Sequence, residues 1–318
     1  MEIRRITPAD AASLIRCFRT CYGDSYANPL FYRENDLEAA IASGRLRSVV
    51  AIDDGDIVGH TGLNVTHPDA LVAEAGNTVV DPRMRGRGVL AQMGEQLAAL
   101  TTAEGFVGYV HFPTTAHEIM QKRATSGTGR ETGIMLAYVP AETDYRDFDS
   151  AGGRVAATVV YQPFVPSPPA RIHTPGAYLA RISRFASDLD LSREHVPGSP
   201  AQSDASTFTV YHQRDRGLCR VEVDEIGADI RQVVEAAPAS GVMHVDLPMD
   251  DPACPEASLA LTETGFAYCA WLPGYARGDV LRLQRIEKLT AAEASPDLVT
   301  AAAGQILDEI LTEIRRPT

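Results

Sequence analysis

The stretch Val79-Val80-Asp81-Pro82-Arg83-Met84-Arg85-Gly86-Arg87-Gly88-Val89-Leu90 decides the fold. Its first two residues end an apolar run that predicts a strand. Pro82 predicts a turn, because its ring fixes φ and keeps the preceding residue out of the helical region. Apolar residues then recur at helical spacing from Val89 to Leu100. The stretch therefore predicts a strand, a glycine-rich turn and a helix, in that order.

A turn of this kind can bind an anion. The first turn of a helix has backbone N–H groups without intrahelical partners, and the helix dipole makes that end positive. Gly86 and Gly88 let a ligand approach the backbone closely. The alternative is a solvated arginine-rich turn before a surface helix. Two glycines at a strand–helix junction favour the anion site, and phosphate is its usual ligand.

This stretch resembles motif A of the GNAT superfamily of acyl-CoA N-acyltransferases, Arg/Gln-x-x-Gly-x-Gly/Ala, whose amides hold the pyrophosphate of coenzyme A. Arg85 and Gly88 match the first two fixed positions. Leu90 stands where Gly or Ala is usual, so it is expected either to narrow the pantetheine channel or to turn into the core. The resemblance implies that the acyl-CoA donor is bound by Val79, Val80, Asp81, Arg85, Gly86, Arg87, Gly88, Val89 and Leu90.

Composition narrows the class of protein. The chain has 318 residues, which favours two domains, and no run approaches the ~18 apolar residues of a membrane span. The N-terminus runs into a predicted helix rather than a signal peptide, so we expect a cytoplasmic protein. Five cysteines without a Cys-x-x-Cys pattern argue against disulfides and against a metal site. Cys17 and Cys21 are predicted to be small core residues.

The net charge of −13 argues against broad binding to nucleic acids or to anionic membranes. It does not argue against coenzyme A, because surface charges are screened beyond ~8 Å at physiological salt. The three arginines of the turn supply positive charge locally. Nearly all basic residues are arginine and alanine is abundant, which indicates a GC-rich, bacterial genome.

The first half of the chain predicts the order β-α-α-β-β-β-α-β-α-β. Strands are expected at 2–6, 48–52, 57–65, 73–81, 106–112 and 133–139, and helices from residue 8, at 36–43, 89–100 and 114–124. This order is similar to the GNAT fold from about residue 1 to 140. In that fold the strands before and after the long helix splay apart, and the pantetheine arm lies in the gap.

A weak internal repeat organises the second half. Strand-Pro, helix, Gly-strand-Pro occurs at 108–140 and again at 243–273. We therefore predict two GNAT-like units of α/β (α+β) class, each a mixed, mostly antiparallel sheet flanked by helices. Residues 1–145 form the catalytic domain that binds acyl-CoA, and residues 150–318 form a degenerate domain ending in a helix at 298–314, which serves packing or an oligomer contact such as a homodimer.

The second unit lacks the features of a donor site. Its strand–helix junction, Val223-Asp224-Glu225-Ile226-Gly227-Ala228-Asp229, has one glycine, three carboxylates and no arginine. Like charge would repel a pyrophosphate there. We expect this unit to stabilise the first and to wall the acceptor site.

Acyl transfer from a thioester to an amine needs a base for the amine and a hydrogen-bond donor for the carbonyl oxygen. In the family that donor is a backbone N–H of the strand before the motif, which implicates Val79 or Val80. A Glu on that strand is often the base. Glu74 fits this role, and a solvated residue at the strand end is the alternative.

The leaving thiolate can also take a proton, often from a Tyr on the helix after the splayed strand. The predicted helix 114–124 has no Tyr, and His117 is the nearest substitute. Thr114 or Thr115 would cap that helix. The resemblance places three residues near the acceptor pocket: Tyr26, Asn28 and His60. No Ser or Cys is paired with a His as a nucleophile, so direct attack on the thioester is expected.

Three functions follow. The first is a transferase, most simply an N-acetyltransferase, that moves an acyl group from acyl-CoA to a small cationic or polar amine, without a metal. The second takes its acyl group from aminoacyl-tRNA, against which the acidic chain argues. The third is a non-catalytic sensor that binds acyl-CoA, suggested by Leu90 and the missing Tyr.

Overall fold

The computed structural model describes residues 1–26, 28–143 and 153–315. The first half contains, in chain order, β1 (Glu2–Arg5), η1 (Pro8–Asp10), α1 (Ala11–Tyr22), η2 (Pro29–Tyr32), α2 (Glu34–Ala42), β2 (Leu46–Asp53), β3 (Asp56–Asn64), β4 (Val72–Val80), η3 (Pro82–Met84), α3 (Val89–Ala103), β5 (Gly108–His111), α4 (Glu118–Ala124), β6 (Arg130–Val139) and β7 (Val155–Pro163). The predicted order of helices and strands is confirmed from β1 to β6, and β7 is an addition to it.

The second half contains β8 (Ala170–Ile172), η4 (Gly176–Tyr178), α5 (Leu179–Asp188), β9 (Arg193–His195), β10 (Thr207–Gln213), η5 (Arg214–Arg216), β11 (Leu218–Glu225), α6 (Ile230–Ala236), β12 (Val242–Pro248), α7 (Cys254–Thr262), β13 (Ala267–Leu272), β14 (Val280–Ile286) and α8 (Ala301–Ile314). Helix α5 and strands β8, β9 and β14 were not predicted, and β9 pairs in parallel with β8.

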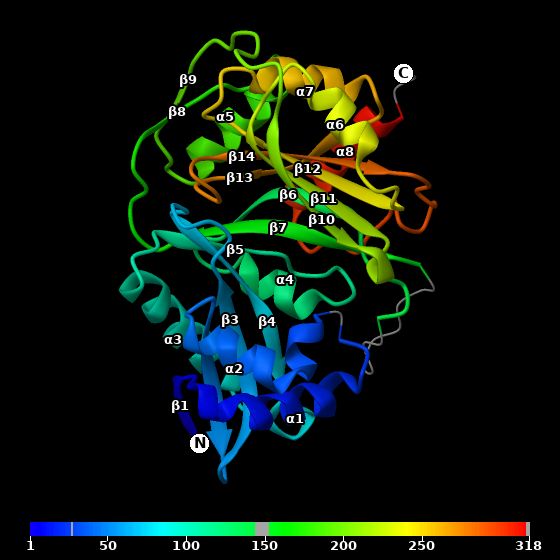
Figure 1. Ribbon diagram of the computed structural model, residues 1–318. Helices are drawn as coiled ribbons and strands as arrows, with labels where there is room; N and C mark the ends of the chain where they lie inside the picture. The colour runs from blue at the N-terminus through cyan, green and yellow to red at the C-terminus, as the bar shows by residue number, and fades with distance from the viewer. Residues whose placement is uncertain (27, 144–152, 316–318) are drawn as a thin grey trace.

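One twelve-stranded sheet runs through both halves, in the order β1-β2-β3-β4-β5-β7-β6-β13-β14-β12-β11-β10 (Figure 1). Among the described residues, only the β4–β5 and β11–β12 pairs of this sheet are parallel. The α+β class with a mixed, mostly antiparallel sheet is therefore confirmed. The order β3-β4-β5-β7-β6 of the first half recurs as β10-β11-β12-β14-β13, with the same strand directions.

Strand β7 differs from the sequence-based division of the chain. The prediction assigned its residues to the second unit, but β7 lies between β5 and β6 and pairs antiparallel with both. Both strands that pair with β7 lie earlier in the chain, and the apolar run of β7 itself does not indicate which strands it pairs with. A division after β7, near residue 165, gives each half its repeated set of strands, and we propose it in place of 145–150.

Helices cover both faces of the sheet in the first half. Val50 on β2 belongs to a buried cluster with residues of α1 and α2, including Cys17 and Cys21. Its neighbours Val49 and Ala51 belong to the opposite cluster, with residues of α3. Alternate residues of a strand point to opposite faces, so this half is a three-layer structure with the sheet in the middle.

The two halves meet where β6 pairs with β13. A Cβ on Gly133 would lie 2.2 Å from the carbonyl oxygen of Cys269, so only glycine fits at this contact. The buried amide of Gln284 donates to the carbonyls of Ile134 and Tyr268, both at 3.0 Å, and accepts from Leu136 N–H at 2.9 Å. One core cluster continues across this seam. The halves are therefore joined by a sheet and a shared core.

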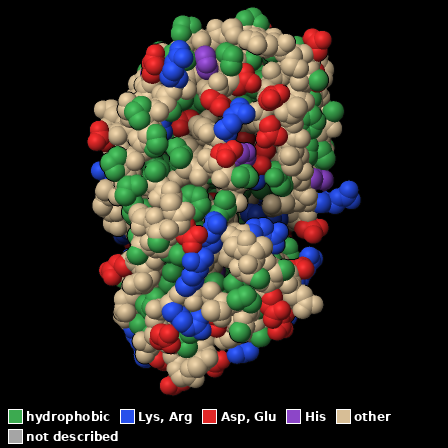
Figure 2. Space-filling model, turned by 60° about the vertical axis from the view of Figure 1, so that its left-hand side comes forward, with side chains coloured by type: hydrophobic (Ala, Val, Ile, Leu, Met, Phe, Trp, Pro, Cys, Tyr) green, Lys and Arg blue, Asp and Glu red, His purple; other side chains and the backbone are tan. Residues whose placement is uncertain are grey.

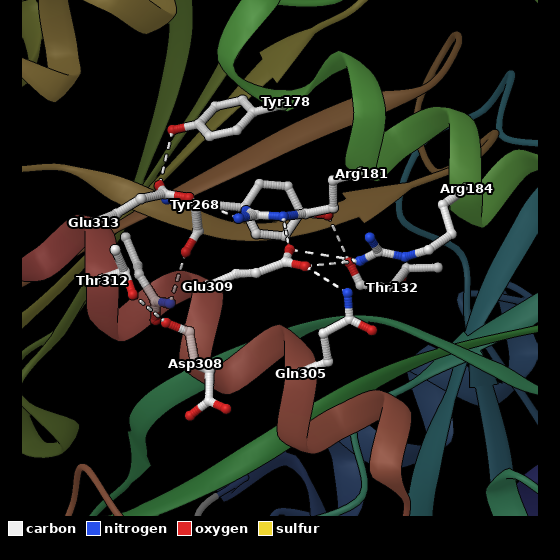
Figure 3. A network of polar contacts seen from close by, with 11 residues as sticks. Thr132, Tyr178, Arg181, Arg184, Tyr268, Gln305, Asp308, Glu309, Thr312 and Glu313 are labelled. Carbon is white, nitrogen blue, oxygen red and sulfur yellow. Dashed lines mark hydrogen bonds and ion pairs between the residues drawn. The ribbon is translucent and has the colours of Figure 1, made fainter.

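Helix α8 covers the seam, because it contacts both β6 and β13. Figure 3 shows Glu309 and Glu313 of α8 pointing toward Arg181 of α5. The guanidinium of Arg181 donates to Glu313 at 2.8 Å and lies 4.3 Å from the centre of the Tyr268 ring. The predicted C-terminal helix thus packs within the chain.

Candidate functional site

The turn between β4 and α3 is shaped by Asp81 and two glycines. The Asp81 carboxylate accepts from Arg83 N–H at 2.9 Å and pairs with the Arg83 guanidinium at 2.7 Å, which holds the pKa of Asp81 below its usual range. Gly86 and Gly88 have φ of 75° and 77°, a left-handed conformation that favours glycine. Gly88 is the N-cap of the 15-residue helix α3. The backbone therefore presents the first turn of α3 without a side-chain cap.

A cavity of about 270 Å³ lies against this turn. Of the nine residues assigned to the donor, seven line it: Val79, Val80, Arg85, Gly86, Gly88, Val89 and Leu90. Asp81 and Arg87 are absent from the described lining of both cavities. Asp81 is buried beneath the turn and Arg87 is exposed, so Asp81 shapes the turn from below.

Strand β4 carries a bulge beside this cavity. His60 pairs with Val79 and Gly62 pairs with Gly76, so two residues of β4 oppose one residue of β3. The bulged residue Asn77 has φ of 53°. The described β4–β5 pairing ends at Ala75 with His111, and the two strands separate beyond it. The end of β4 thus opens a gap next to the turn.

A larger cavity of about 1030 Å³ joins the first one. The residues that line both are Tyr22, Thr78, Leu90, His117 and Met120. Leu90 is half-buried at this junction, whereas Val89 is 1% exposed and packs in the core. Leu90 thus lines the junction of the two cavities, and whether it narrows a pantetheine channel stays a prediction. Residues of the second half line the far part of this cavity, including Tyr211, Arg220 and His244.

Glu74 lines the larger cavity near the start of β4. Its Oε2 accepts a hydrogen bond from the hydroxyl of Tyr275 at 3.0 Å. Tyr275 is 2% exposed and follows β13 in the second half. The turn that carries Tyr275 is fixed to the start of β4, because Leu71 and Val72 donate their N–H groups to the carbonyl of Gly274 at 2.8 and 3.2 Å. The second half thus holds the Glu74 carboxylate in place.

His117 is the N-cap of α4 and lines both cavities. The prediction that Thr114 or Thr115 caps this helix was wrong. Thr114 bridges to Ala157 and Thr115 bonds to the carbonyl of Ala156, so both are held against β7, and a turn at 115–116 precedes the helix. Burial, and next the charge of Arg85, lower the pKa of His117, so its imidazole is neutral at pH 7. A neutral imidazole can donate or accept a hydrogen bond, but it is a weaker acid than imidazolium.

The three residues expected at the acceptor pocket have different positions. Tyr26 and Asn28 line the larger cavity, and the Tyr26 hydroxyl donates to the Asn77 side chain at 3.0 Å. His60 is fully buried and lies edge-on to the stacked rings of Phe18 and Phe31, outside the described lining of either cavity. It lies on the face of β3 that α1 covers, and burial lowers its pKa to about 4.

His60 instead acts on the bulge. Its Nδ1–H donates to the carbonyl of Asn77 at 2.7 Å, opposite the contact from Tyr26. Asn77 is a residue that sequence reasoning missed, although Gly-Asn within a strand pattern is a signal for a bulge. Tyr275 and Arg220 were missed as well, and no local signal links them to residues about 150–200 positions earlier.

The counterpart of the donor turn in the second half is filled by the chain itself. Asp229, the N-cap of α6, accepts from the N–H and the hydroxyl of Ser206, both at 2.7 Å. A Cβ on Gly227 would lie 2.2 Å from the carbonyl carbon of Ala205. This helix start therefore has no open space comparable to the cavity at α3.

Among the described residues, no group of three or more His, Cys, Asp and Glu is placed to hold a metal ion. No described helix is long and apolar enough to cross a membrane.

Comparison with known proteins identifies the first half. A family model described as an acetyltransferase (GNAT) domain matches residues 2–121. No curated protein matches the chain. These findings confirm the resemblance inferred from the turn and the enzyme class, a GNAT-type acetyltransferase.

Solved structures cover about half of the chain. A GCN5-related N-acetyltransferase from Kribbella flavida is 24% identical, covering 51% of this chain and 97% of its own, with a TM-score of 0.40. A phosphinothricin acetyltransferase from Sinorhizobium meliloti, solved with acetyl-CoA, is 19% identical, covering 52% and 88%, with a TM-score of 0.40. A ribosomal-protein-alanine N-acetyltransferase from Brucella melitensis is 16% identical, covering 52% and 100%, also with a TM-score of 0.40.

Proposed function

Because residues 2–121 are a GNAT acetyltransferase domain, we propose that the protein transfers an acetyl group from acetyl-CoA to the amine of a small molecule. The observation that carries the proposal is the pair of joined cavities. One lies at the open start of α3, and the other holds a carboxylate at the far end of β4. The first suits a pyrophosphate and the second suits an amine.

The gap beside β4 supports a specific donor for the carbonyl oxygen of the thioester. Asp81 N–H bonds to Val58 of β3, whereas the Val80 carbonyl is contacted by Arg85 Nε at 3.3 Å and by Cys21 Sγ at 3.6 Å, both outside β3. The N–H and C=O of one strand residue point to the same side, and neighbouring residues alternate. Val80 N–H therefore faces away from β3, which favours Val80 over Val79 as the oxyanion donor.

The reaction then proceeds by direct attack. Glu74 takes a proton from the bound ammonium group through water in the larger cavity, because Val80 lies six residues beyond Glu74 on β4. The free amine attacks the thioester carbon, and negative charge on the carbonyl oxygen is stabilised by Val80 N–H. The C–S bond then breaks, the second proton of the attacking nitrogen passes to the leaving thiolate, and neutral His117 at the junction donates a hydrogen bond to the sulfur. The amide and coenzyme A are the products.

The test is amine-dependent release of the coenzyme A thiol from acetyl-CoA, measured across a panel of small amines. Glu74→Gln keeps the shape of the side chain but cannot accept a proton. We expect it to lower kcat by about 10²- to 10⁴-fold while acetyl-CoA still binds. Glu95→Gln is the matched control, because Glu95 lines the same cavity from α3. Equal turnover by wild type and Glu74→Gln would contradict the role of Glu74.

A further inference from the structure

The part of the larger cavity that the second half provides is rich in positive charge. Its charged lining residues are Arg214, Arg216, Arg220 and Arg282, with Asp215 as the one carboxylate among the described residues of that half. The sign of the charge here is opposite to that of the whole chain, which has a net charge of −13. Figure 2 shows Lys and Arg side chains near the recess at the waist of the molecule. Positive charge concentrated in one cavity of an acidic protein suggests a site for an anion.

Internal partners take up the charge of some of these arginines. Arg282 is 2% exposed and makes two hydrogen bonds of 2.6 Å to Asp246. Arg220 pairs through one nitrogen with Glu222, at 2.7 Å. A buried pair such as Arg282–Asp246 stabilises the wall but leaves little charge for a ligand.

Arg216 is different. Its Nη1 donates to the Gln213 side chain at 2.9 Å, and its Nε is buried without a partner in the described part of the chain. No carboxylate among the described residues forms an ion pair with it. The guanidinium lies 5.2 Å from the centre of the Tyr138 ring, another residue that lines the cavity. Within the described residues, the Arg216 guanidinium is thus held in place by neutral groups, and a guanidinium so placed can bind an anion.

In the repeated strand order, Arg220 of β11 corresponds to Glu74 of β4. In the first half, Val72 pairs with Gly108, and Glu74 pairs two residues later with Val110. In the second half, the parallel pairing starts at Leu218, and Arg220 is again two residues later, opposite His244. The second half therefore carries a cation where the first half carries the carboxylate, and both side chains line the same cavity.

We propose that the acceptor amine carries an oxyanion group, a carboxylate or a phosphate, which binds to Arg216 and Arg220 while the amine faces Glu74. This inference rests on the proposed function and adds the class of acceptor. A guanidinium binds such groups through paired N–H donors, and Arg220 has nitrogens left over from its contact with Glu222. His244 beside them stays neutral, because burial and the nearby Arg282 lower its pKa to about 3. The acceptor is then bound at both ends: its amine contacts the first half of the protein, and its anionic group contacts the second half.

The test compares amines that differ only in the anionic group. L-alanine is compared with L-alaninamide for the carboxylate, and O-phosphoethanolamine with ethanolamine for the phosphate, each at saturating acetyl-CoA. A wider set of amino acids and phosphorylated amines is paired in the same way. We expect kcat/KM to be about 10- to 100-fold higher for the anionic member of the productive pairs, since charge-assisted hydrogen bonds have this worth. The pair with the larger ratio of kcat/KM, anionic over neutral amine, shows whether the site prefers a carboxylate or a phosphate.

Variants assign the preference to the two arginines. Arg216 is half-buried in a turn, so Arg216→Gln is the variant less expected to disturb folding. Arg220→Gln is the second variant. Both should lose most of the preference through a higher KM for the anionic amine. Arg231→Gln, an exposed residue of α6, should keep it.

Equal kcat/KM within every pair, or no turnover of any anionic member, would overturn the inference. Acetyl-CoA binding, measured by calorimetry on the same samples, keeps this result separate from the proposed function. Retained binding with a preference for neutral amines contradicts only the acceptor class. Loss of binding by the wild type contradicts both proposals.

Discussion

At the scale of single residues, the site depends on three hydrogen bonds between residues that are not neighbours in the sequence. Tyr275 donates to Glu74, and Tyr26 with His60 holds the carbonyl and side chain of Asn77. Each hydrogen bond restricts the rotation of the residue that accepts it, Glu74 in one case and Asn77 in the other two. Precise placement of this kind accounts for a large share of the rate of an enzymatic reaction.

The Tyr275 contact gives a direct prediction. Tyr275→Phe removes the hydroxyl that orients the Glu74 carboxylate, so kcat/KM for the amine should fall about tenfold, the worth of one hydrogen bond to a charged group. Steady-state kinetics with acetyl-CoA measures it. Tyr178→Phe is the matched control, because the Tyr178 hydroxyl donates to Glu313 at 3.3 Å, away from the cavity. An equal loss in both variants would indicate a general effect on the fold.

The donor turn could be predicted from the sequence because it is contiguous. Its glycines, its proline and the following helix are neighbours in the chain, and local chemistry fixes their geometry. The contact of Tyr275 with Glu74 joins residues 201 positions apart, so no spacing could reveal it. His60 was assigned to the pocket because a resemblance places a strand but does not decide which face a side chain occupies.

At the scale of helices and strands, one carboxylate ties α8 to β13 and α5 of the second half. Glu313 accepts from Tyr268 N–H at 2.9 Å, from Arg181 at 2.8 Å and from the Tyr178 hydroxyl at 3.3 Å. Arg181 also pairs with Glu309, and these contacts form the network in Figure 3. Arg181 has 9% of its side chain exposed, so water does not replace a lost partner easily.

Glu313→Ala should lower the free energy of unfolding by about 3 kcal/mol, because it leaves the largely buried Arg181 cation with one partner fewer and the Tyr268 N–H unpaired. Urea unfolding at pH 7.5 measures the change. Asp308→Ala is the control on the same helix. Asp308 is exposed, and its carboxylate points away from the network in Figure 3, so a change within about 0.5 kcal/mol is expected. Similar values for the two variants would contradict the role of the network.

Elements with a clear period were predictable, and those defined by distant partners were not. The helix of α3 and the hairpin of β2 and β3 follow from local apolar spacing and turn residues. The start of α4 at Glu118 depends on Thr114 and Thr115 pairing with β7, which lies some forty residues later. The place of β7 between β5 and β6 has the same cause.

At the scale of the whole molecule, two copies of one strand order share a sheet, a core and a cavity. The repeat of strand-Pro, helix, Gly-strand-Pro predicted two related units. The repeat could not predict the pairing of β6 with β13, because the register of Ala270 opposite Gly133 is set by tertiary packing. One half supplies the donor turn and the carboxylate, and the other supplies Tyr275 and the arginine wall.

Buried histidines make the whole fold sensitive to acid. Burial lowers the pKa of His60 to about 4 and those of His111 and His244 to about 3, whereas all three titrate near 6.5 when unfolded. The unfolded chain therefore binds more protons between pH 6.5 and 4, and stability falls as the pH falls. Three such groups give a slope of about 4 kcal/mol per pH unit near pH 5.

Urea unfolding between pH 7.5 and 4.5 tests this. His60→Asn should reduce the slope by about 1.4 kcal/mol per pH unit, the contribution of one proton. His212→Asn, on the exposed β10, is the control and should leave the slope unchanged. A slope that is the same in wild type and His60→Asn would contradict a neutral, buried His60.

The central claim is that acetyl-CoA binds at the turn between β4 and α3, and the most direct measurement is calorimetric titration with acetyl-CoA. Gly86→Ala and Gly105→Ala form a matched pair. Both glycines have positive φ, 75° and 87°, and an added Cβ would meet no atom within 4 Å at either. Each substitution costs the fold about 1–2 kcal/mol, but only Gly86 lines the donor cavity.

We predict micromolar binding by the wild type and by Gly105→Ala, and at least tenfold weaker binding by Gly86→Ala. Absence of binding by the wild type, or equal affinity in all three proteins, would contradict the claim.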